Sequence, residues 1–313
     1  MKNLEDSLHI QFIPLGTCAG NSTPLQDQSA YIVKIFNKNQ ENKLLILLDA
    51  GSPRVLSPKY LDHQNLRAIC FSHLHNDHFR YFIPLIRILI RTRPNKPLFI
   101  IAHPKAILYI KVLLFFSFKG RIPRFLRLIG SYENQIKQIH LSNLSNTQEN
   151  KQEGLFATIR LTSAQHSRWA VAFRITIQST PLDHGKDTEL ADLVYSPDTA
   201  ATSQNLVEFA KHAQFWCLDT TFNDQQMFAQ LKTKPKQVGH SSPVYSAKLC
   251  QQAKVENYIA IHYFWSRFGQ EYKTAKKNIK KRAQRFYKGN IIVSQDLRAI
   301  DLHEFDGKKK EKN

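Results

Sequence analysis

Residues 69–78 read ICFSHLHNDH, a short apolar run that leads directly into four metal-binding side chains. The apolar letters are typical of the end of a buried β-strand. Neutral imidazole and carboxylate groups bind zinc, manganese or iron without the help of a thiolate. His73 and His75 alternate to one side of the loop, whereas Asp77 and His78 can reach the other side. The segment therefore predicts two adjacent metal ions at a strand end.

Around this segment, short β-type runs alternate with helical ones over most of the chain. The expected strands are residues 8–15, 30–35, 43–48, 67–71, 97–102, 157–161, 171–177, 192–195, 215–218, 258–261 and 291–293. The expected helices are residues 79–91, 104–118, 203–212, 241–254 and 270–287, with Ser203 as the N-cap of the third. This alternation predicts a mixed α/β sandwich.

The composition indicates a folded, basic protein. The chain has 313 residues, of which 42% are hydrophobic, and this is enough to bury a large core and to exclude disordered and fibrous classes. Lys and Arg number 44 against 25 Asp and Glu, so the net charge of +19 favours a polyanionic partner or substrate. We expect one domain over residues 1–306 and a basic, disordered tail over residues 307–313.

Two stretches concentrate the positive charge. Eleven Arg and Lys residues lie between positions 80 and 127, interleaved with Phe and Leu, and eight lie between positions 273 and 288 on an expected helix. Such clusters favour phosphate backbones and make binding fall with salt. An ordinary solvated helix face is the alternative for the second stretch. The apolar residues within 113–118 of the first stretch have three possible roles, namely core packing, a homodimer contact or a wall for an apolar substrate.

The remaining sequence features favour a cytoplasmic location. The first ten residues contain acidic side chains and no apolar core, which argues against a secretory signal. The most apolar region, residues 98–118, is interrupted by charges, and its longest uncharged part, residues 112–118, is too short to span a membrane. Four cysteines, at positions 18, 70, 217 and 250, have neither zinc-ribbon spacing nor the density of a disulfide framework.

The His-x-His-x-Asp-His pattern after a strand resembles the hallmark of the metallo-β-lactamase fold hydrolases, and the resemblance covers roughly residues 8–268. It implies a four-layer αββα sandwich and two divalent metal ions, zinc first, with manganese or iron as alternatives. The later ligands of that family lie near strand ends, where His166, Asp198 and His262 stand here. The resemblance assigns one ion to His73, His75 and His166. It assigns the other to Asp77, His78 and His262, with Asp198 shared between the two ions.

Within that superfamily the chain is most similar to ribonuclease Z, which trims the 3′ end of precursor tRNA. The motifs that carry this likeness are PLGT at 14–17, FSHLHNDH at 71–78, GHSS at 239–242 and AIHYFWSRF at 260–268. The likeness implies a catalytic set of Asp77, His240 and Asp219. Hydroxide generated between the metals would attack phosphorus in line, and His240 would donate a proton to the leaving oxygen. Asp219, in LDTTF at 218–222, stands where the family has His-Glu and would orient His240.

Other functions stay open at this point. Only 32 residues separate His166 from Asp198, an interval in which bacterial ribonuclease Z inserts a long tRNA-gripping arm. The compact arrangement also resembles the cyclic phosphodiesterases of the phosphonate pathway. The superfamily site serves thioester and lactone hydrolysis as well, and a non-catalytic, basic RNA-binding module with structural metals is a further alternative. The expected partner is a phosphodiester, with tRNA or another RNA as the leading case.

Overall fold

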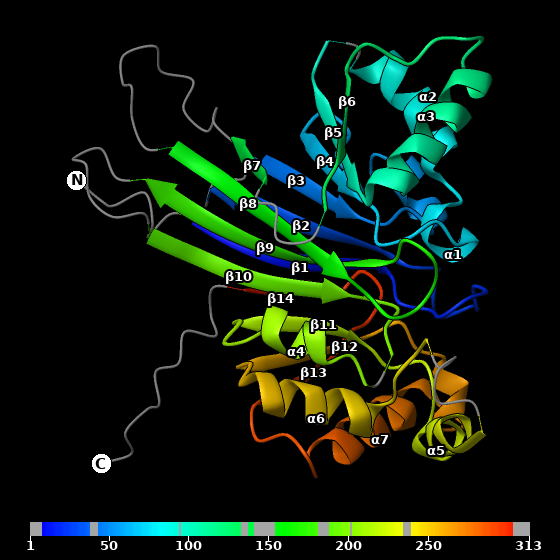
Figure 1. Cartoon of the computed structure of the whole chain (residues 1–313), viewed down its shortest axis with the longest axis vertical. Helices are drawn as coiled ribbons and strands as arrows, with labels where there is room; N and C mark the ends of the chain where they lie inside the picture. Colours follow the sequence, from blue (N-terminus) through cyan, green and yellow to red (C-terminus); the bar gives the residue numbers. More distant parts are fainter. Residues whose placement is uncertain are drawn as a thin grey trace.

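The computed structural model describes residues 8–37, 43–93, 95–132, 137–140, 154–180, 188–200, 202–233 and 239–302. Two seven-stranded sheets pack face to face, and helices cover both outer faces (Figure 1). This is the four-layer αββα sandwich that the sequence predicts, and the prediction of fold class is confirmed.

The first sheet has the strand order β14-β1-β2-β3-β4-β5-β6. Its strands are β1 (Leu8–Gly16), β2 (Ala30–Asn37), β3 (Lys43–Leu48), β4 (Leu66–Cys70), β5 (Leu98–Ala102), β6 (Leu126–Gly130) and β14 (Ile300–Asp301). Strands β3 to β6 run parallel, so their carboxyl ends share one edge of the sheet. The helical segments that follow them are η2 (Pro53–Leu56), α1 (Asn76–Phe79), α2 (Phe82–Thr92) and α3 (Pro104–Ser117).

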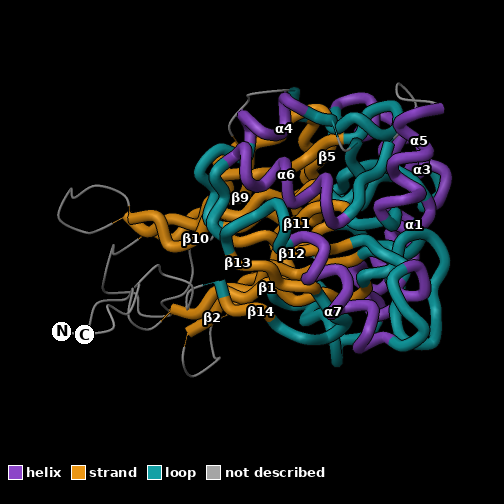
Figure 2. The backbone as a smooth tube through the Cα atoms, turned by 90° about the horizontal axis from the view of Figure 1, so that it is seen from below, coloured by secondary structure: helices purple, strands orange, loops and turns teal. Residues whose placement is uncertain are grey.

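The second sheet has the order β13-β12-β11-β10-β9-β8-β7. Its strands are β7 (Lys137–His140), β8 (Gly154–Ser163), β9 (Val171–Thr180), β10 (Thr188–Ser196), β11 (Phe215–Asp219), β12 (Asn257–Ile261) and β13 (Asn290–Val293). Its helical segments are α4 (Gln204–Phe209), α5 (Asp224–Thr233), α6 (Pro243–Ala253), η4 (Trp265–Arg267) and α7 (Tyr272–Ala283). Helices α4, α6 and α7 cover its outer face (Figure 2).

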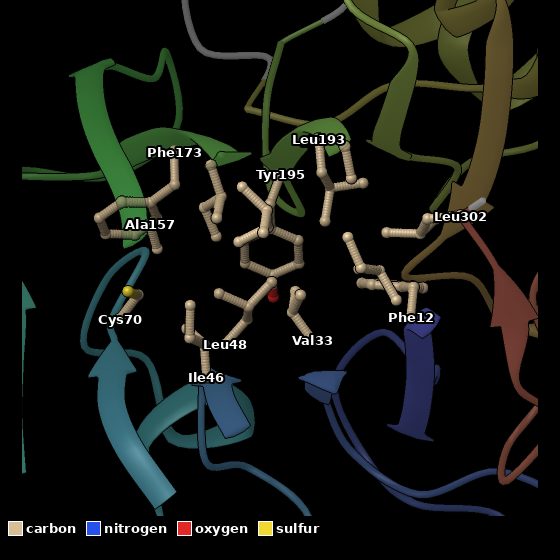
Figure 3. Packing of buried hydrophobic residues seen from close by; sticks show 14 of the residues in the cluster. Phe12, Val33, Ile46, Leu48, Cys70, Ala157, Phe173, Leu193, Tyr195 and Leu302 are labelled. Carbon is tan, nitrogen blue, oxygen red and sulfur yellow. The ribbon is translucent and has the colours of Figure 1, made fainter. Parts of the chain in front are cut away.

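Apolar side chains from both sheets form the central core. Phe12, Val33 and Leu48 of the first sheet face Phe173 and Tyr195 of the second (Figure 3). Five of the six residues of β3 are buried, because one face of this strand meets the other sheet and the opposite face meets helices. The two sheets therefore hold their shared edge, and the loops on it, in a rigid arrangement.

Several expected elements differ from the observed ones. The expected helix 79–91 is two helices, because the chain turns at Arg80 and Tyr81 between α1 and α2. Strands β6, β7 and β14 and helix α5 were not expected. Strands β7 and β14 have only four and two residues, and α5 buries only Met227, so it carries little of the amphipathic periodicity by which a helix is predicted.

Two residue-level expectations are also corrected. Ser203 stands at the N-cap position of α4, but its side chain makes no capping hydrogen bond and its hydroxyl lies 3.3 Å from that of Thr199. Arg93, counted among the polyanion-binding residues, is buried and donates to the backbone carbonyls of Leu66, Lys96 and Pro97. It therefore ties α2 to the sheet and is not part of a basic surface.

The domain prediction rests on the sequence alone, and its tail, residues 307–313, lies outside the described residues. Over the described ranges, none of the helices combines the length and the apolar character that crossing a membrane requires.

The central core makes a stability prediction. Phe173 is fully buried between the sheets, so Phe173→Ala should lower the free energy of unfolding by about 3–5 kcal/mol. Phe228 on α5 is 64% exposed, so Phe228→Ala should change it by less than about 0.5 kcal/mol. Urea denaturation followed by circular dichroism measures both. Equal losses for the two variants would contradict the packing described here.

Candidate metal centre

The predicted ligands gather at one edge of the sandwich, on α1 and on the loops that follow four of the strands. His73 and His75 lie in the loop between β4 and α1, and Asp77 and His78 lie in α1 itself. From the second sheet, His166 lies between β8 and β9, Asp198 follows β10, and His262 directly follows β12. The structure thus brings together side chains that are up to 189 positions apart in the sequence.

The first group contains three imidazoles. The Nδ1 atom of His75 lies 2.9 Å from Nε2 of His73 and 3.2 Å from Nε2 of His166. The Oδ2 atom of Asp198 lies 3.2 Å from Nε2 of His166 and 3.6 Å from Nε2 of His73. These four side chains can present one atom each to a single ion.

The second group lies against the other oxygen of the same aspartate. Nε2 of His78 and Nε2 of His262 are 3.3 Å apart, and Oδ2 of Asp77 lies 3.4 Å from the His262 nitrogen. Oδ1 of Asp198 lies 3.1 Å from Nε2 of His78 and 3.2 Å from Nε2 of His262. Asp198 therefore faces one group with each carboxylate oxygen, which is the position of a bridging ligand.

The far side of several rings is held so that the lone pair points into the cluster. Nδ1 of His78 lies 2.7 Å from the carboxylate of Asp49, and Nδ1 of His166 lies 2.8 Å from the carbonyl oxygen of Gly239. Both partners can only accept, so each Nδ1 carries the proton and each Nε2 is left with its lone pair. This arrangement is the one that orients histidine ligands in metal sites.

His73 and His262 are held by hydroxyl groups. The hydroxyl of Ser72 donates its proton to Asp49 at 2.7 Å, so it can only accept from Nδ1 of His73, which lies 3.1 Å away. The Thr221 hydroxyl lies 2.9 Å from Nδ1 of His262 and 3.1 Å from its carbonyl oxygen. It can donate to the carbonyl and accept from the ring, which again leaves Nε2 facing the cluster.

The cluster has the chemistry of a cation site. Oδ1 of Asp198 is buried and makes no hydrogen bond among the described residues, although two imidazole nitrogens lie close to it. A buried carboxylate oxygen without a donor is costly unless a cation pairs with it. The residues present therefore fit two divalent ions.

His240 stands beside the cluster with a carboxylate behind it. Nδ1 of His240 lies 2.8 Å from Oδ2 of Asp219, the buried last residue of β11, and 4.0 Å from Oδ2 of Asp198. Burial works against the charged imidazole, but the charge of Asp219 and the hydrogen bond to it raise the pKa of His240 to about 9. Asp219 also accepts the backbone N–H of Thr221, so its own position is fixed by the loop.

These side chains open into a cavity of about 340 Å³. Its wall includes His75, Asp77, His166, Asp198, His240 and His262, together with Ala19, Gly20, Thr221, Phe222, Phe264 and Arg267. The Arg267 guanidinium lies 4.6 Å from the ring centre of Phe264 and 5.4 Å from that of Phe222, and it donates to the carbonyl of Thr221. A fixed cation and two aromatic rings therefore stand at the mouth of the site.

Sequence reasoning missed the residues that orient the ligands. Asp49 gives only a weak sequence signal of this role, namely that it is the lone carboxylate after the apolar run of β3. In the structure its backbone adopts a positive φ of 59°. Gly239 allows a close approach, since a Cβ there would lie 2.7 Å from Nδ1 of His166. Neither Thr221 nor Gly20, whose N–H donates to Asp77 at 2.9 Å, carries a sequence signal of this role.

The family assignment agrees with this geometry. A model of the beta-lactamase superfamily domain matches residues 45–263, which include all seven predicted ligands. The chain belongs to this family. It has the metallo-β-lactamase fold, and membership supports metal-dependent hydrolysis. No curated protein sequence matches the chain significantly.

Solved structures of this fold resemble the whole chain. YhfI from Bacillus subtilis, a metallo-β-lactamase fold protein, is 18% identical with a TM-score of 0.67, over 94% of this chain and 99% of YhfI. A long-form RNase Z from yeast is 16% identical with a TM-score of 0.67, over 96% of this chain and 43% of the yeast protein. A diphosphatase of the PhnP family is 13% identical with a TM-score of 0.57, over 93% of this chain and 97% of that chain. At these identities the similarity concerns the fold.

The contacts of Asp49 make a prediction about metal affinity. Asp49→Asn keeps the side-chain volume but removes the charge that orients His78, so zinc affinity should fall about 10–100-fold. Competition with a chromogenic chelator measures the affinity. Glu208→Gln, a change in an exposed ion pair on α4, is the control and should leave it unchanged. Unchanged affinity in Asp49→Asn would contradict the orienting role.

Proposed function

We propose that the protein is a binuclear metal-dependent phosphodiesterase that cleaves RNA in the manner of ribonuclease Z. The observation that carries the proposal is the His240–Asp219 pair at 2.8 Å, next to two ligand groups that share Asp198. A hydrolase that must expel an alkoxide needs a proton donor beside its metal centre, and this pair provides one. Similarity to the yeast RNase Z structure supports the fold on which the proposal rests.

Seven side chains would hold the two ions. His73, His75 and His166 would bind one of them, Asp77, His78 and His262 would bind the other, and Asp198 would bridge them. Two divalent ions, zinc in the first instance, would supply a nucleophilic water near neutral pH and Lewis acidity toward a phosphoryl oxygen. Burial of His73, His78 and His262 keeps bulk water away from the ligands.

His240 would deliver the proton to the leaving oxygen. Its Nδ1 is engaged by Asp219, so Nε2 is the atom that can donate to a substrate in the cavity. Asp219 holds the ring in place and stabilises its charged form, which is the form that a proton donor must have. Asp77 would stay ionised as a ligand, because a divalent ion beside it favours the charged carboxylate.

The charge distribution favours a nucleic-acid strand as substrate. Arg267 faces the cavity from η4, and α7 begins five residues later with a row of exposed lysines that includes Lys273, Lys277 and Lys280. A nucleic-acid strand with one phosphate at the metal centre would thus extend toward a basic helix face. Phe222 and Phe264 offer aromatic surfaces on which its bases could stack. The net charge of +19 agrees with a polyanionic substrate.

A small phosphodiester is the second candidate. Between His166 and Asp198 the described residues form β9 and β10, and residues 181–187 between them are too few for a long tRNA-gripping arm. The cavity of about 340 Å³ is near the lower end of the range for small-molecule sites. Similarity in fold to a diphosphatase of the PhnP family, which is a chain of similar length, supports this candidate.

Cleavage of a precursor tRNA tests the choice between the two substrates. The zinc- or manganese-loaded protein should cut a precursor with a 3′ trailer, and Asp77→Ala should abolish the cut because it removes a metal ligand. A gel of labelled RNA reads the cleavage site, and bis-p-nitrophenyl phosphate reports general phosphodiesterase activity. Turnover of the small ester by a protein that leaves the precursor tRNA uncut would shift the assignment to a small substrate. Retained turnover in Asp77→Ala would contradict the two-metal scheme.

The pH profile tests the role of His240. A proton donor must be protonated, so activity is lost as pH rises through its pKa. Removing the charge of Asp219 lowers that pKa, so in Asp219→Asn the alkaline limb of kcat/KM should move to lower pH. Asp224→Asn changes a carboxylate that bonds Ser242 and Arg282 outside the cavity, and it should leave the limb in place. An unshifted limb in Asp219→Asn would assign proton donation to another group.

A further inference from the structure

Helix α3 has two apolar faces, of which only one is covered. Its inner face, with Ala106, Ile107, Ile110 and Leu114, is buried against the first sheet. Its outer face carries five large apolar residues on the turns between, and Ile122 follows in the next loop. The six residues of this α3 patch are Leu108 (63% exposed), Tyr109 (52%), Val112 (49%), Phe115 (48%), Phe116 (77%) and Ile122 (37%).

The neighbouring helix α2 shows that an exposed apolar face is not a general feature of the helices that cover the first sheet. Helix α2 covers the same sheet and turns Arg87, Arg91 and Thr92 to solvent, as expected for an amphipathic surface helix. A helix that is apolar all round is normally buried on all sides. The outer face of α3 therefore indicates a surface that a binding partner or a membrane covers.

The charge around the α3 patch restricts the kind of partner or surface that can cover it. Exposed cations border it at both ends and along one side, namely Lys105, Lys111, Lys119 and Arg121. From residue 78 to residue 132 the chain contains no Asp or Glu. Among the described residues, none of these four cations takes part in an ion pair. The patch is thus an apolar surface inside a purely positive rim.

We propose that α3 docks the protein on a bilayer surface that contains anionic lipids. Phe115, Phe116 and Leu108 would enter the boundary between headgroups and acyl chains, while Tyr109 would lie at headgroup level. The lysines at the rim would meet lipid phosphates, and Lys111 can extend its ammonium out of the apolar boundary. The protein would lie on the membrane and not cross it, in agreement with the absence of a spanning helix over the described ranges.

The rim and the apolar centre of the α3 patch disfavour the two other occupants. A second copy of the chain bound through the same face would set cations opposite cations, with no acidic residue in the segment to pair them. A nucleic acid would match the rim but would leave Leu108 and Val112 against phosphates and sugars. An anionic bilayer matches both the rim and the apolar centre.

Vesicle sedimentation with the full-length, metal-loaded protein tests the proposal. The protein should bind vesicles of phosphatidylcholine with phosphatidylglycerol at least tenfold more tightly than vesicles of phosphatidylcholine alone, and salt should weaken the binding. Phe116→Ser and Leu108→Ser should each weaken it about tenfold, because each removes an exposed apolar group without a change in charge. Both side chains are exposed, so neither change disturbs the core.

The control for the apolar variants is Phe228→Ser, which alters an equally exposed aromatic residue on α5 and should bind as the unaltered protein does. Equal binding by Phe116→Ser, Leu108→Ser and Phe228→Ser would show attraction by net charge alone and overturn the proposal. Absence of binding to the anionic vesicles would also overturn it. A dimer in sedimentation velocity that Phe116→Ser dissociates would assign the patch to self-association instead.

Discussion

The carboxylate of Asp49, which follows β3 of the first sheet, accepts four hydrogen bonds from the loop after β4, from α1 and from the opposite sheet. The N–H and hydroxyl of Ser72 lie 2.8 and 2.7 Å away, and Nδ1 of His78 lies 2.7 Å away. The hydroxyl of Tyr195, from β10 of the opposite sheet, is the fourth donor at 2.7 Å. Burial raises the pKa of Tyr195 well above its usual value, which keeps the phenol a donor. A fully buried carboxylate is tolerated because all of its charge is met by donors.

The candidate metal centre depends on that interaction because its proposed ligands come from both sheets. The first sheet contributes the loop after β4, and the second contributes His166, Asp198 and His262 from the ends of its strands. Asp49 joins Tyr195 to His78 across the interface, so a change in sheet packing would displace the ligands of one group relative to those of the other. Asp198 faces both groups, so its position depends on how the two sheets pack.

The local part of this arrangement could be predicted from sequence, and the long-range part could not. A dense cluster such as HLHNDH identifies itself, and resemblance to the metallo-β-lactamase fold added His166, Asp198 and His262. The groups that orient these ligands are ordinary residues whose role arises only from folding. Asp49 and Tyr195 are 146 positions apart, and Gly239 and His166 are 73 positions apart. Likewise, periodicity predicted α3 but could not show that one of its two apolar faces would be left exposed.

We propose that two metal ions lie side by side in this protein and share Asp198. Electron paramagnetic resonance of the manganese-loaded protein, with metal content measured on the same sample, tests it directly. We expect two manganese ions per chain with a spin-coupled spectrum, and loss of the coupling in Asp198→Asn. One ion per chain, or two ions without coupling in the unaltered protein, would contradict the claim.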